Sequence, residues 1–541
     1  MVVGDLAVPF VVFALQIGAW TLDPTTATRL LRGDHATYMI AANYLRTAPL
    51  VSWPLGELPG YVAPGGASLG LADAQPWAVL AHRLVNAMYP DSFVQILGWV
   101  LLMNYVLAFR FVVQTVRWVR DGAAGKAELP TVVISWLAGV LLLTMPFFTL
   151  RAVHVSLTGQ WVIVAAIALH VCHHEPSPRA TRWWLLLVLA SAAVHPYMVP
   201  VVALLSLPYL VRLVQRRGHS GLIVATVVAL MALFISIVLG YLSVGVRTRG
   251  LGYGSYAATL DALVSPGRAS RTLTRAGTTA VGLEGFAWLG LGLVGLVMVM
   301  AIVGHRSWWA RLQPAIWRHG GLLATCVGLY LFATWPIVRI GALVLVDTAG
   351  SPFALGPIGE LFRANGRFAW SLAWLIAIGT CAVIARHLRP SHAIALLSLA
   401  VLVQVADFRN PGFGGRDDRR YALASESLRE AARDGVVAVR VEPAVIVPDC
   451  LPASMSFDDV VPVLAAASVI GLPVNSGNLA RAHPDMRADI CQTAGQEFLA
   501  GRYRDEVVYV VRDHREGLAC RPLYSDLLTC RPSTVVAVEG G

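Results

Sequence analysis

Arginine and histidine residues at the ends of apolar segments are the first side chains in this sequence whose spacing could support chemistry. Arg151 and His154 are three residues apart, so in a helical segment their side chains would share one face. A guanidinium and an imidazole on one face could hold an anionic group such as a phosphate. The alternative is that these side chains only lie at the membrane interface with their polar ends toward water. That would suit Arg151, but it fits His154 and His195 less well. We therefore favour anion binding for these three side chains.

A second set of candidates lies further along the chain. It consists of Arg247 and Tyr253 in the segment 246–283, Glu284 directly after it, Arg363 and Arg367 around Asn365-Gly366, and Gln160 beyond His154. Arginine recognises phosphate through a planar pair of donors, so one shared anion site is the simplest interpretation. Single arginines are common at membrane interfaces, and only the grouping of these residues supports this interpretation.

Two acidic residues in the segment 23–91 could act in chemistry or in helix capping. Asp34 stands in Leu-Arg-Gly-Asp-His beside His35, shortly after the first apolar segment. If Asp34 has no chemical role, it is a solvated loop carboxylate or the N-cap of a helix expected over 35–47. Asp73 precedes a helix expected over 75–88, and for Asp73 capping is the slightly favoured interpretation.

The composition places these residues in a membrane protein. The 541 residues are 56% hydrophobic and only 14% charged, and the mean hydropathy is +0.63. Apolar stretches of roughly 17 to 25 residues, the length that crosses a hydrocarbon core, recur along three quarters of the chain. We expect about eleven transmembrane helices, at residues 6–22, 92–115, 130–150, 156–172, 183–195, 197–214, 220–245, 284–304, 320–345, 367–386 and 392–407.

The distribution of basic residues predicts the orientation of these helices. Lys and Arg concentrate in alternate short connections, for example around Arg117, Arg179, Arg212, Arg306 and Arg386. Because translocated positive charge is disfavoured, these connections are predicted to be cytoplasmic, with the N-terminus inside and the C-terminal tail exported. The net charge of +10 follows largely from this signal, so it does not indicate a nucleic-acid surface. The expected location is the bacterial inner membrane, with the tail in the periplasm.

Two domains are expected. Residues 1–407 form a transmembrane domain with a large first periplasmic loop at 23–91, part of which is expected to lie along the membrane interface. Residues 408–541 form a small α/β domain, with helices near 421–433 and 457–469 and strands in 435–447 and 506–512.

The cysteines agree with an exported tail. Cys172, Cys326 and Cys381 lie in apolar segments, where a thiol acts as a small hydrophobic group. The four cysteines of the tail are expected to form two disulfides in an oxidising compartment, and among three pairings we choose Cys450–Cys491 and Cys520–Cys530.

Several functional classes lack their usual motifs. The sequence has no P-loop, no metal-ligand cluster with zinc spacing and no G-x-S-x-G nucleophile elbow. The near absence of charge inside the apolar segments argues against an ion-coupled transporter. The sequence specifies no cofactor and leaves a divalent metal open.

A series of short motifs resembles an uncharacterised bacterial family of multi-pass proteins with the GT-C glycosyltransferase architecture. The resemblance covers nearly the whole chain and rests on the order and spacing of its motifs. They are Gly33-Asp34, Trp53-Pro54-Leu55-Gly56, Asp73 with Pro76, Arg151-x-x-His154, Gln160-Trp161, His195-Pro196-Tyr197, Gly252-Tyr253-Gly254, Glu284-Gly285-Phe286, Gly366-Arg367-Phe368, Asn475-Ser476 and Ala480-Arg481.

The resemblance implies an integral membrane transferase that takes a sugar from a polyprenyl-phosphate donor. It assigns the catalytic carboxylate of the first exported loop to Asp34, which would act as general base toward a glycan or other cell-envelope acceptor. Gln160 departs from the family pattern, in which histidine is usual. The alternatives from other classes are a transporter or flippase for a polyprenyl-linked glycan and a non-catalytic assembly subunit.

Overall fold

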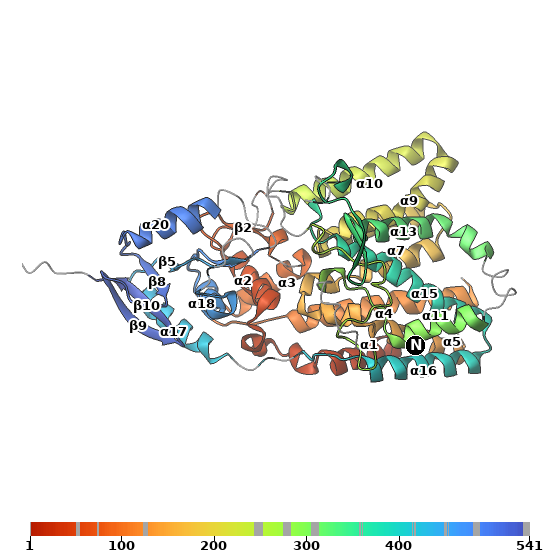
Figure 1. Cartoon of the computed structure of the whole chain (residues 1–541), viewed down its shortest axis with the longest axis horizontal. Coiled ribbons are helices and arrows are strands. Elements are labelled where there is room, and N and C mark those ends of the chain that lie inside the picture. Colours follow the sequence, from red (N-terminus) through yellow and green to blue (C-terminus); the bar gives the residue numbers. More distant parts are fainter. Residues whose placement is uncertain are drawn as a thin grey trace, which may run out of the picture.

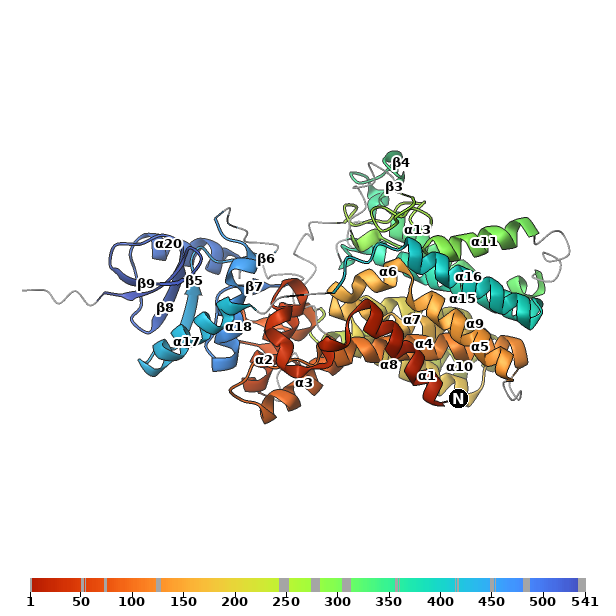
Figure 2. The ribbon, with the colours of Figure 1, turned by 90° about the horizontal axis from the view of Figure 1, so that it is seen from below.

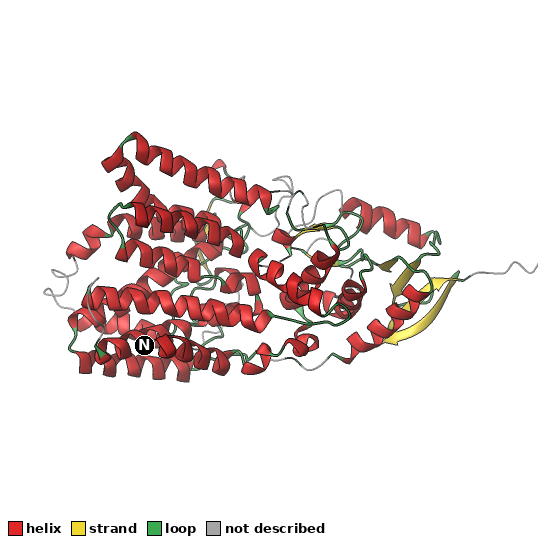
Figure 3. Ribbon diagram, turned by 180° about the vertical axis from the view of Figure 1, so that it is seen from behind, coloured by secondary structure: helices red, strands yellow, loops and turns green. Residues whose placement is uncertain are grey.

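The computed structural model of the chain is elongated and has two halves (Figures 1 and 2). Long helices fill one half, while the C-terminal sheet and its helices, together with α2 (Gly33–Thr47) and α3 (Pro76–Met88), form the other (Figure 3). The structure describes residues 2–49, 53, 55–72, 75–122, 128–242, 253–273, 283–303, 313–355, 359, 361–413, 415, 418–447, 452, 454–479 and 487–533.

The helical half is a bundle around one large apolar core. The largest fully buried side chains of this core include Trp184, Trp370 and Trp374. The helices are α1 (Val2–Gln16), α4 (Leu97–Asp121), α5 (Leu129–Leu143), α6 (Pro146–Thr149), α7 (Trp161–Cys172), α8 (Pro178–Val194), α9 (Met198–Arg217), α10 (His219–Val238), α11 (Leu291–Val303), α13 (Gly320–Thr334), α15 (Trp370–His387) and α16 (Pro390–Asp407).

These helices confirm a multi-pass membrane architecture. Every apolar segment predicted to span overlaps at least one of them. Within the described residues six helices are long and apolar enough to cross a membrane, or seven if the bent pair Leu129–Leu143 and Pro146–Val153 counts as one span, and three shorter apolar helices accompany them. The count of eleven spans and their orientation stay predictions.

The segment predicted as a span over 320–345 is only partly helical, and this prediction was wrong for its second half. Helix α13 ends at Thr334, and β3 (Ile337–Ile340) and β4 (Leu343–Asp347) form an antiparallel hairpin. Pro336 explains the change, because proline lacks an N–H donor and disfavours helical backbone at the residue before it. The turn residue Gly341 adopts a φ of 58°, which glycine tolerates without strain.

The first loop folds as predicted at its two helices, α2 (Gly33–Thr47) and α3 (Pro76–Met88). Around them lie η1 (Ala19–Leu22), η2 (Pro24–Leu30), β1 (Glu57–Leu58), β2 (Ala67–Ser68) and η3 (Leu69–Leu71). Helix α2 does not lie along a membrane interface, because its residues from His35 to Leu45 are all buried and it packs between α3 and the tail. An interfacial position stays a prediction for α3.

The tail forms a small α/β unit around a four-stranded sheet. The strand order is β5 (Ala438–Val441), β8 (Val507–Val511), β10 (Leu527–Pro532) and β9 (Leu518–Tyr524), and only β5 and β8 are parallel. A separate parallel pair joins β6 and β7. In chain order, the elements of the tail are α17 (Arg419–Arg433), β5 (Ala438–Val441), β6 (Ile446–Val447), α18 (Phe457–Ile470), β7 (Gly477–Asn478), the π-helix η9 (Arg487–Thr493), α20 (Ala494–Leu499), β8 (Val507–Val511), β9 (Leu518–Tyr524) and β10 (Leu527–Pro532).

The disulfide Cys520–Cys530 is confirmed, because the two residues face each other in the register of β9 and β10 and are bonded. Cys491 is also disulfide-bonded, while Cys450 lies outside the described residues. Cys172, Cys326 and Cys381 are free and buried.

The tail and the first loop share one apolar core. Tyr44 of α2 donates to the carbonyl of Leu472 at 2.7 Å, and Asn43 donates to Ser468 of α18 at 3.2 Å. Residues of both parts, from Ala27 to Leu527, belong to the same buried cluster. The division into domains 1–407 and 408–541 stays a prediction, but this shared core fixes the tail against α2, the helix that carries Asp34.

Candidate functional site

A cavity of about 480 Å³ lies between the helical bundle and the tail, since residues of α9 and α10 and also Val447 and Asn478 line it. One wall is apolar and comes from α9 and α10, through residues such as Val199, Ala203 and Leu233. The lining also includes the polar or charged side chains of Asp34, His154, His195, Tyr197, Glu284, Arg363, Arg367 and Asn478. The cavity therefore joins titratable groups to a surface supplied by two apolar helices.

Asp34 lies in the first turn of α2 and directs its carboxylate to partners outside that helix. The preceding Gly33 adopts a φ of 48°, which sets the entry of the chain into α2. The carboxylate pairs with His154 and accepts a hydrogen bond of 3.0 Å from the side-chain amide of Asn478. The N-cap residue is Arg32, which makes no side-chain cap. These contacts favour a site role for Asp34 over the capping alternative.

The surroundings of Asp34 keep it ionised. Burial alone would raise the pKa of its carboxyl, but the hydrogen bond and charge of His154, with smaller contributions from His35 and Asn478, hold that pKa below its ordinary value of 3.8. His35 itself is buried and lies with its Nε2 2.8 Å from the carbonyl of Ala152. At neutral pH the site therefore presents a carboxylate.

A second group places Glu284 between two arginines. Its carboxylate lies 2.6 Å from Nε of Arg367 and 3.5 Å from Arg151, which is 1% exposed. The guanidinium of Arg151 lies over the ring of Trp370 at 4.8 Å, and that of Arg367 over Tyr197 at 4.7 Å. Burial opposes ionisation, but the two arginines hold the pKa of Glu284 far below its ordinary value.

Two glycines allow this ion group to form. Glu284 lies in η6 (Leu283–Gly285) and Arg367 in η8 (Asn365–Ala369), and these two short helices touch. A Cβ atom added at Gly366 would lie 2.6 Å from the Cα of Gly285. Only glycine permits this approach, which explains why Gly-containing motifs flank both charged residues.

His195 follows α8 and is buried at the polar end of the cavity. Its Nδ1 accepts a hydrogen bond of 3.1 Å from the backbone N–H of Tyr197. Burial lowers its pKa well below the ordinary value, and the charge of Arg367 acts in the same direction. His195 is therefore a neutral imidazole at neutral pH, able to donate through Nε2 but without a positive charge.

The other predicted site residues lie in different places. Arg151 is behind Glu284 and does not line the cavity, and neither does Gln160, whose side chain accepts from Trp374 at 2.8 Å and donates to Leu157. Tyr253 donates to the carbonyl of Ala354 at 2.8 Å and is also away from the lining. Asp73 and Arg247 lie outside the described residues.

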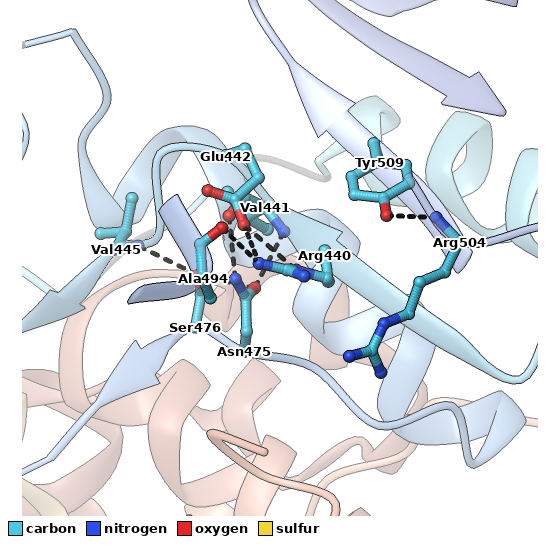
Figure 4. Close-up of polar contacts among 9 residues, drawn as sticks. All are labelled: Arg440, Val441, Glu442, Val445, Asn475, Ser476, Ala494, Arg504 and Tyr509. Atoms are coloured by element: carbon cyan, nitrogen blue, oxygen red, sulfur yellow. Dashed lines mark hydrogen bonds and ion pairs between the residues drawn. The ribbon is translucent and has the colours of Figure 1, made fainter. Parts of the chain in front are cut away.

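Asn478 is a site residue that the sequence analysis missed. Tyr61 holds it in place, accepting from the backbone N–H of Asn478 at 2.9 Å and donating to its carbonyl at 3.3 Å. The nearby motif Asn475-Ser476 was the feature of the sequence that could have pointed to Asn478. Figure 4 shows how Asn475 bonds both backbone groups of Val441 and how Ser476 accepts from the N–H of Val445, which fixes the chain that leads to β7.

The described residues contain no group of three or more His, Cys, Asp or Glu side chains that could hold a metal ion. The polar end of the cavity is instead a mixture of carboxylates, arginines and histidines. Such a mixture suits a substrate that carries both hydroxyl groups and a negative charge.

Comparisons with known proteins identify a family. Curated proteins give no match. Among solved structures, the chain is similar to ArnT from Cupriavidus metallidurans bound to undecaprenyl phosphate, with a TM-score of 0.45, 11% identity and 98% of each chain covered. It is also similar to the archaeal oligosaccharyltransferase AglB from Archaeoglobus fulgidus in complex with an inhibitory peptide and a dolichol-phosphate, with a TM-score of 0.43, 13% identity, and 94% of this chain and 69% of that chain covered.

Similarities of this size do not establish a shared activity. The family models are more decisive, because they match most of the chain. Residues 6–409 match the domain of unknown function DUF6311, and residues 427–534 match the DUF6311 C-terminal domain. The expectation of an uncharacterised family is confirmed: the chain belongs to the DUF6311 family.

Proposed function

We propose that this protein transfers a sugar from a polyprenyl-phosphate donor to an acceptor hydroxyl, with Asp34 as general base. The observation that carries the proposal is the composition of the cavity, which joins the ionised Asp34 and several cationic or donor side chains to an apolar wall from α9 and α10. A lipid phosphate has the same two-part chemistry, since its chain is apolar and its head is anionic. The resemblance of the sequence motifs to GT-C glycosyltransferases is in agreement.

The proposed reaction is a single displacement at the sugar carbon. The acceptor oxygen forms a bond to that carbon while the bond from the carbon to the phosphate oxygen breaks, and the leaving phosphate keeps the electron pair. The acceptor proton passes to the carboxylate of Asp34. Because the pKa of Asp34 is low, the carboxylate first orients the hydroxyl and accepts the proton as the oxygen becomes acidic during bond formation.

The phosphate is best assigned to Arg363 and to the cavity-facing side of Arg367. Arg367 already neutralises Glu284, so only part of its charge is available. Arg363 lines the cavity, and no ion pair within the described ranges involves it. His154 and His195 supply further hydrogen-bonding groups. Arg151 acts only through Glu284 in this arrangement.

Replacing Arg363 by alanine should weaken donor binding while the fold is retained. A hydrogen bond to a charged group contributes about 1.5–3 kcal/mol, so the dissociation constant for a polyprenyl phosphate should rise by about 10- to 150-fold. Binding of a labelled lipid phosphate to purified protein measures this. Arg268→Ala is the matched control, since Arg268 is an exposed arginine outside the cavity lining. Equal binding of the lipid phosphate by both variants would show that Arg363 does not contact the phosphate.

Asn478 should act as a positioning residue for Asp34. Its hydrogen bond stabilises the ionised form, so Asn478→Ala should raise the pKa of Asp34 and move the acid limb of the turnover profile to higher pH. Turnover should fall more than donor binding. Asn410→Ala is the control, because that amide bonds to Gln16 away from the cavity. An unchanged pH profile in Asn478→Ala would reduce Asn478 to a structural role.

The experiment that tests the proposed function is incubation of the purified protein with a panel of radiolabelled polyprenyl-phosphate sugars. We expect label to leave the lipid for at least one sugar, and to stay on the lipid in Asp34→Asn. A flippase would move the labelled lipid across a vesicle bilayer without releasing the sugar, and it would tolerate the loss of Asp34. Movement without release would therefore overturn the proposal.

A further inference from the structure

The hairpin β3–β4 is unusual because its outer strand is apolar and exposed on both faces. Leu343, Val344, Leu345 and Val346 are 63, 47, 47 and 44% exposed. Successive side chains of a strand point to opposite faces, so neither face of β4 is covered by the protein. Water-facing edge strands usually carry charge or proline instead, and a contiguous apolar patch marks an interaction surface.

The exposed surface of α13 leads directly into this hairpin. Leu323, Val327 and Leu331 are four residues apart, lie on one face of α13 and are 39, 39 and 54% exposed. Only two residues separate the end of α13 from β3. Exposed apolar side chains on a helix of the bundle face acyl chains, so the patch on β4 continues a lipid-facing surface.

Helix α13 by itself is too short to cross a whole hydrocarbon core. Fifteen residues form a helix of about 22 Å, which is shorter than a hydrocarbon core of about 30 Å. The chain beyond Thr334 therefore still lies near the boundary of the hydrocarbon. Trp335 and the exposed Phe353 stand there, joined by a hydrogen bond of 2.8 Å from Trp335 to the carbonyl of Phe353, as is typical of aromatic residues at membrane interfaces.

The two edges of the hairpin limit how deep it can lie. β3 and the turn after it are held to the segment 253–273, since Leu260 donates to the carbonyl of Arg339 at 2.8 Å and Gly341 donates to Asp261 at 3.0 Å. β4 pairs with no further strand in the part of the chain that the structure describes. An open strand edge is not tolerated within hydrocarbon, because its backbone groups would lack partners. The edge must reach water or headgroups while the side chains contact lipid.

We propose that the β3–β4 hairpin is a membrane-interface element, seated in the leaflet on the side of the tail, with the β4 side chains among the upper acyl chains. Figure 2 shows it on the flank of the helical half, toward the end that faces the tail. The partner is the lipid bilayer, and the proposal is independent of the transfer reaction.

The test is fluorescence quenching by lipids of known depth. Leu345→Cys and Leu423→Cys are labelled with bimane in nanodiscs of phosphatidylcholine brominated near the headgroup or near the chain end. Leu423 lies on α17 in the tail and has the same 47% exposure as Leu345, so it is a matched control. We expect several-fold greater loss of fluorescence at position 345 than at 423, with the shallow bromines quenching more strongly than the deep ones.

Other results would overturn the proposal. Quenching of both positions by aqueous iodide and of neither by brominated lipid would place the hairpin in water. Protection from both quenchers that increases with protein concentration would indicate a second copy of the chain as the partner. Leu343→Cys, at the start of β4, repeats the measurement if the first variant does not fold.

Discussion

Replacing Asp34 by asparagine should lower sugar transfer by about 10²- to 10⁴-fold, which is the usual contribution of a positioned acid or base. The amide keeps the shape of the side chain and can still meet His154 and Asn478, but it cannot take a proton. Folding and donor binding should therefore change little. The measurement compares the turnover number and the donor dissociation constant of the two proteins.

Asp23→Asn is the control for this prediction. Asp23 lies in the same loop and accepts from the backbone of Thr25 at 2.9 Å, and asparagine caps such a turn as well as aspartate does. Near-normal turnover in Asp34→Asn would show that the carboxylate is only a loop residue. The transporter and assembly interpretations would then be preferred.

Replacing Glu284 by glutamine should lower the free energy of unfolding by about 3–5 kcal/mol, since it leaves two buried arginine charges without their carboxylate. The side chains of Glu284, Arg151 and Arg367 are 15, 1 and 14% exposed, so water screens their interaction poorly. Denaturant titration in mixed micelles measures the change. Glu175→Gln is the control, because its pair with Arg216 is about half exposed and should contribute at most about 1 kcal/mol.

The contribution of Glu284 to the free energy of unfolding should also depend on pH, and its direction follows from the pKa. The folded pKa of Glu284 is depressed, so its stabilisation is complete above the unfolded value near 4.5 and is lost as the pH falls from there through the folded pKa. The stability difference between the native protein and Glu284→Gln should be the same at neutral pH and at mildly acidic pH, and should shrink in stronger acid. A difference that grows on acidification would contradict this assignment.

Local features of the fold could be predicted from the sequence. Apolar segments and the helices α2, α3, α17 and α18 follow from composition and periodicity over a few neighbouring residues. The pairing Cys520–Cys530 was one choice among three, and the structure decided it. The prediction failed at 320–345, where a continuous apolar pattern did not reveal that Pro336 ends the helix and begins a hairpin. Helix and strand are hard to separate in a short apolar run, because both bury the same residue types.

The candidate site was predictable in its residue types but not in its geometry. His154 and Arg367 could be named as candidates because they are polar residues grouped at the ends of apolar segments, and Asp34 because of the family resemblance. The sequence could not show that Asn478, 444 residues from Asp34, would donate to its carboxylate. Nor could it show that Glu284 would separate Arg151 from the cavity.

The sequence by itself determined a multi-pass helical protein with an α/β tail, because hydrophobic length and period are local properties of the chain. Only the tertiary structure decided which polar groups meet. Those pairings depend on how α2, η6, η8 and β7 pack, and the close approach of Gly285 and Gly366 or the shared core of α2 and α18 is set by contacts between segments far apart in the chain.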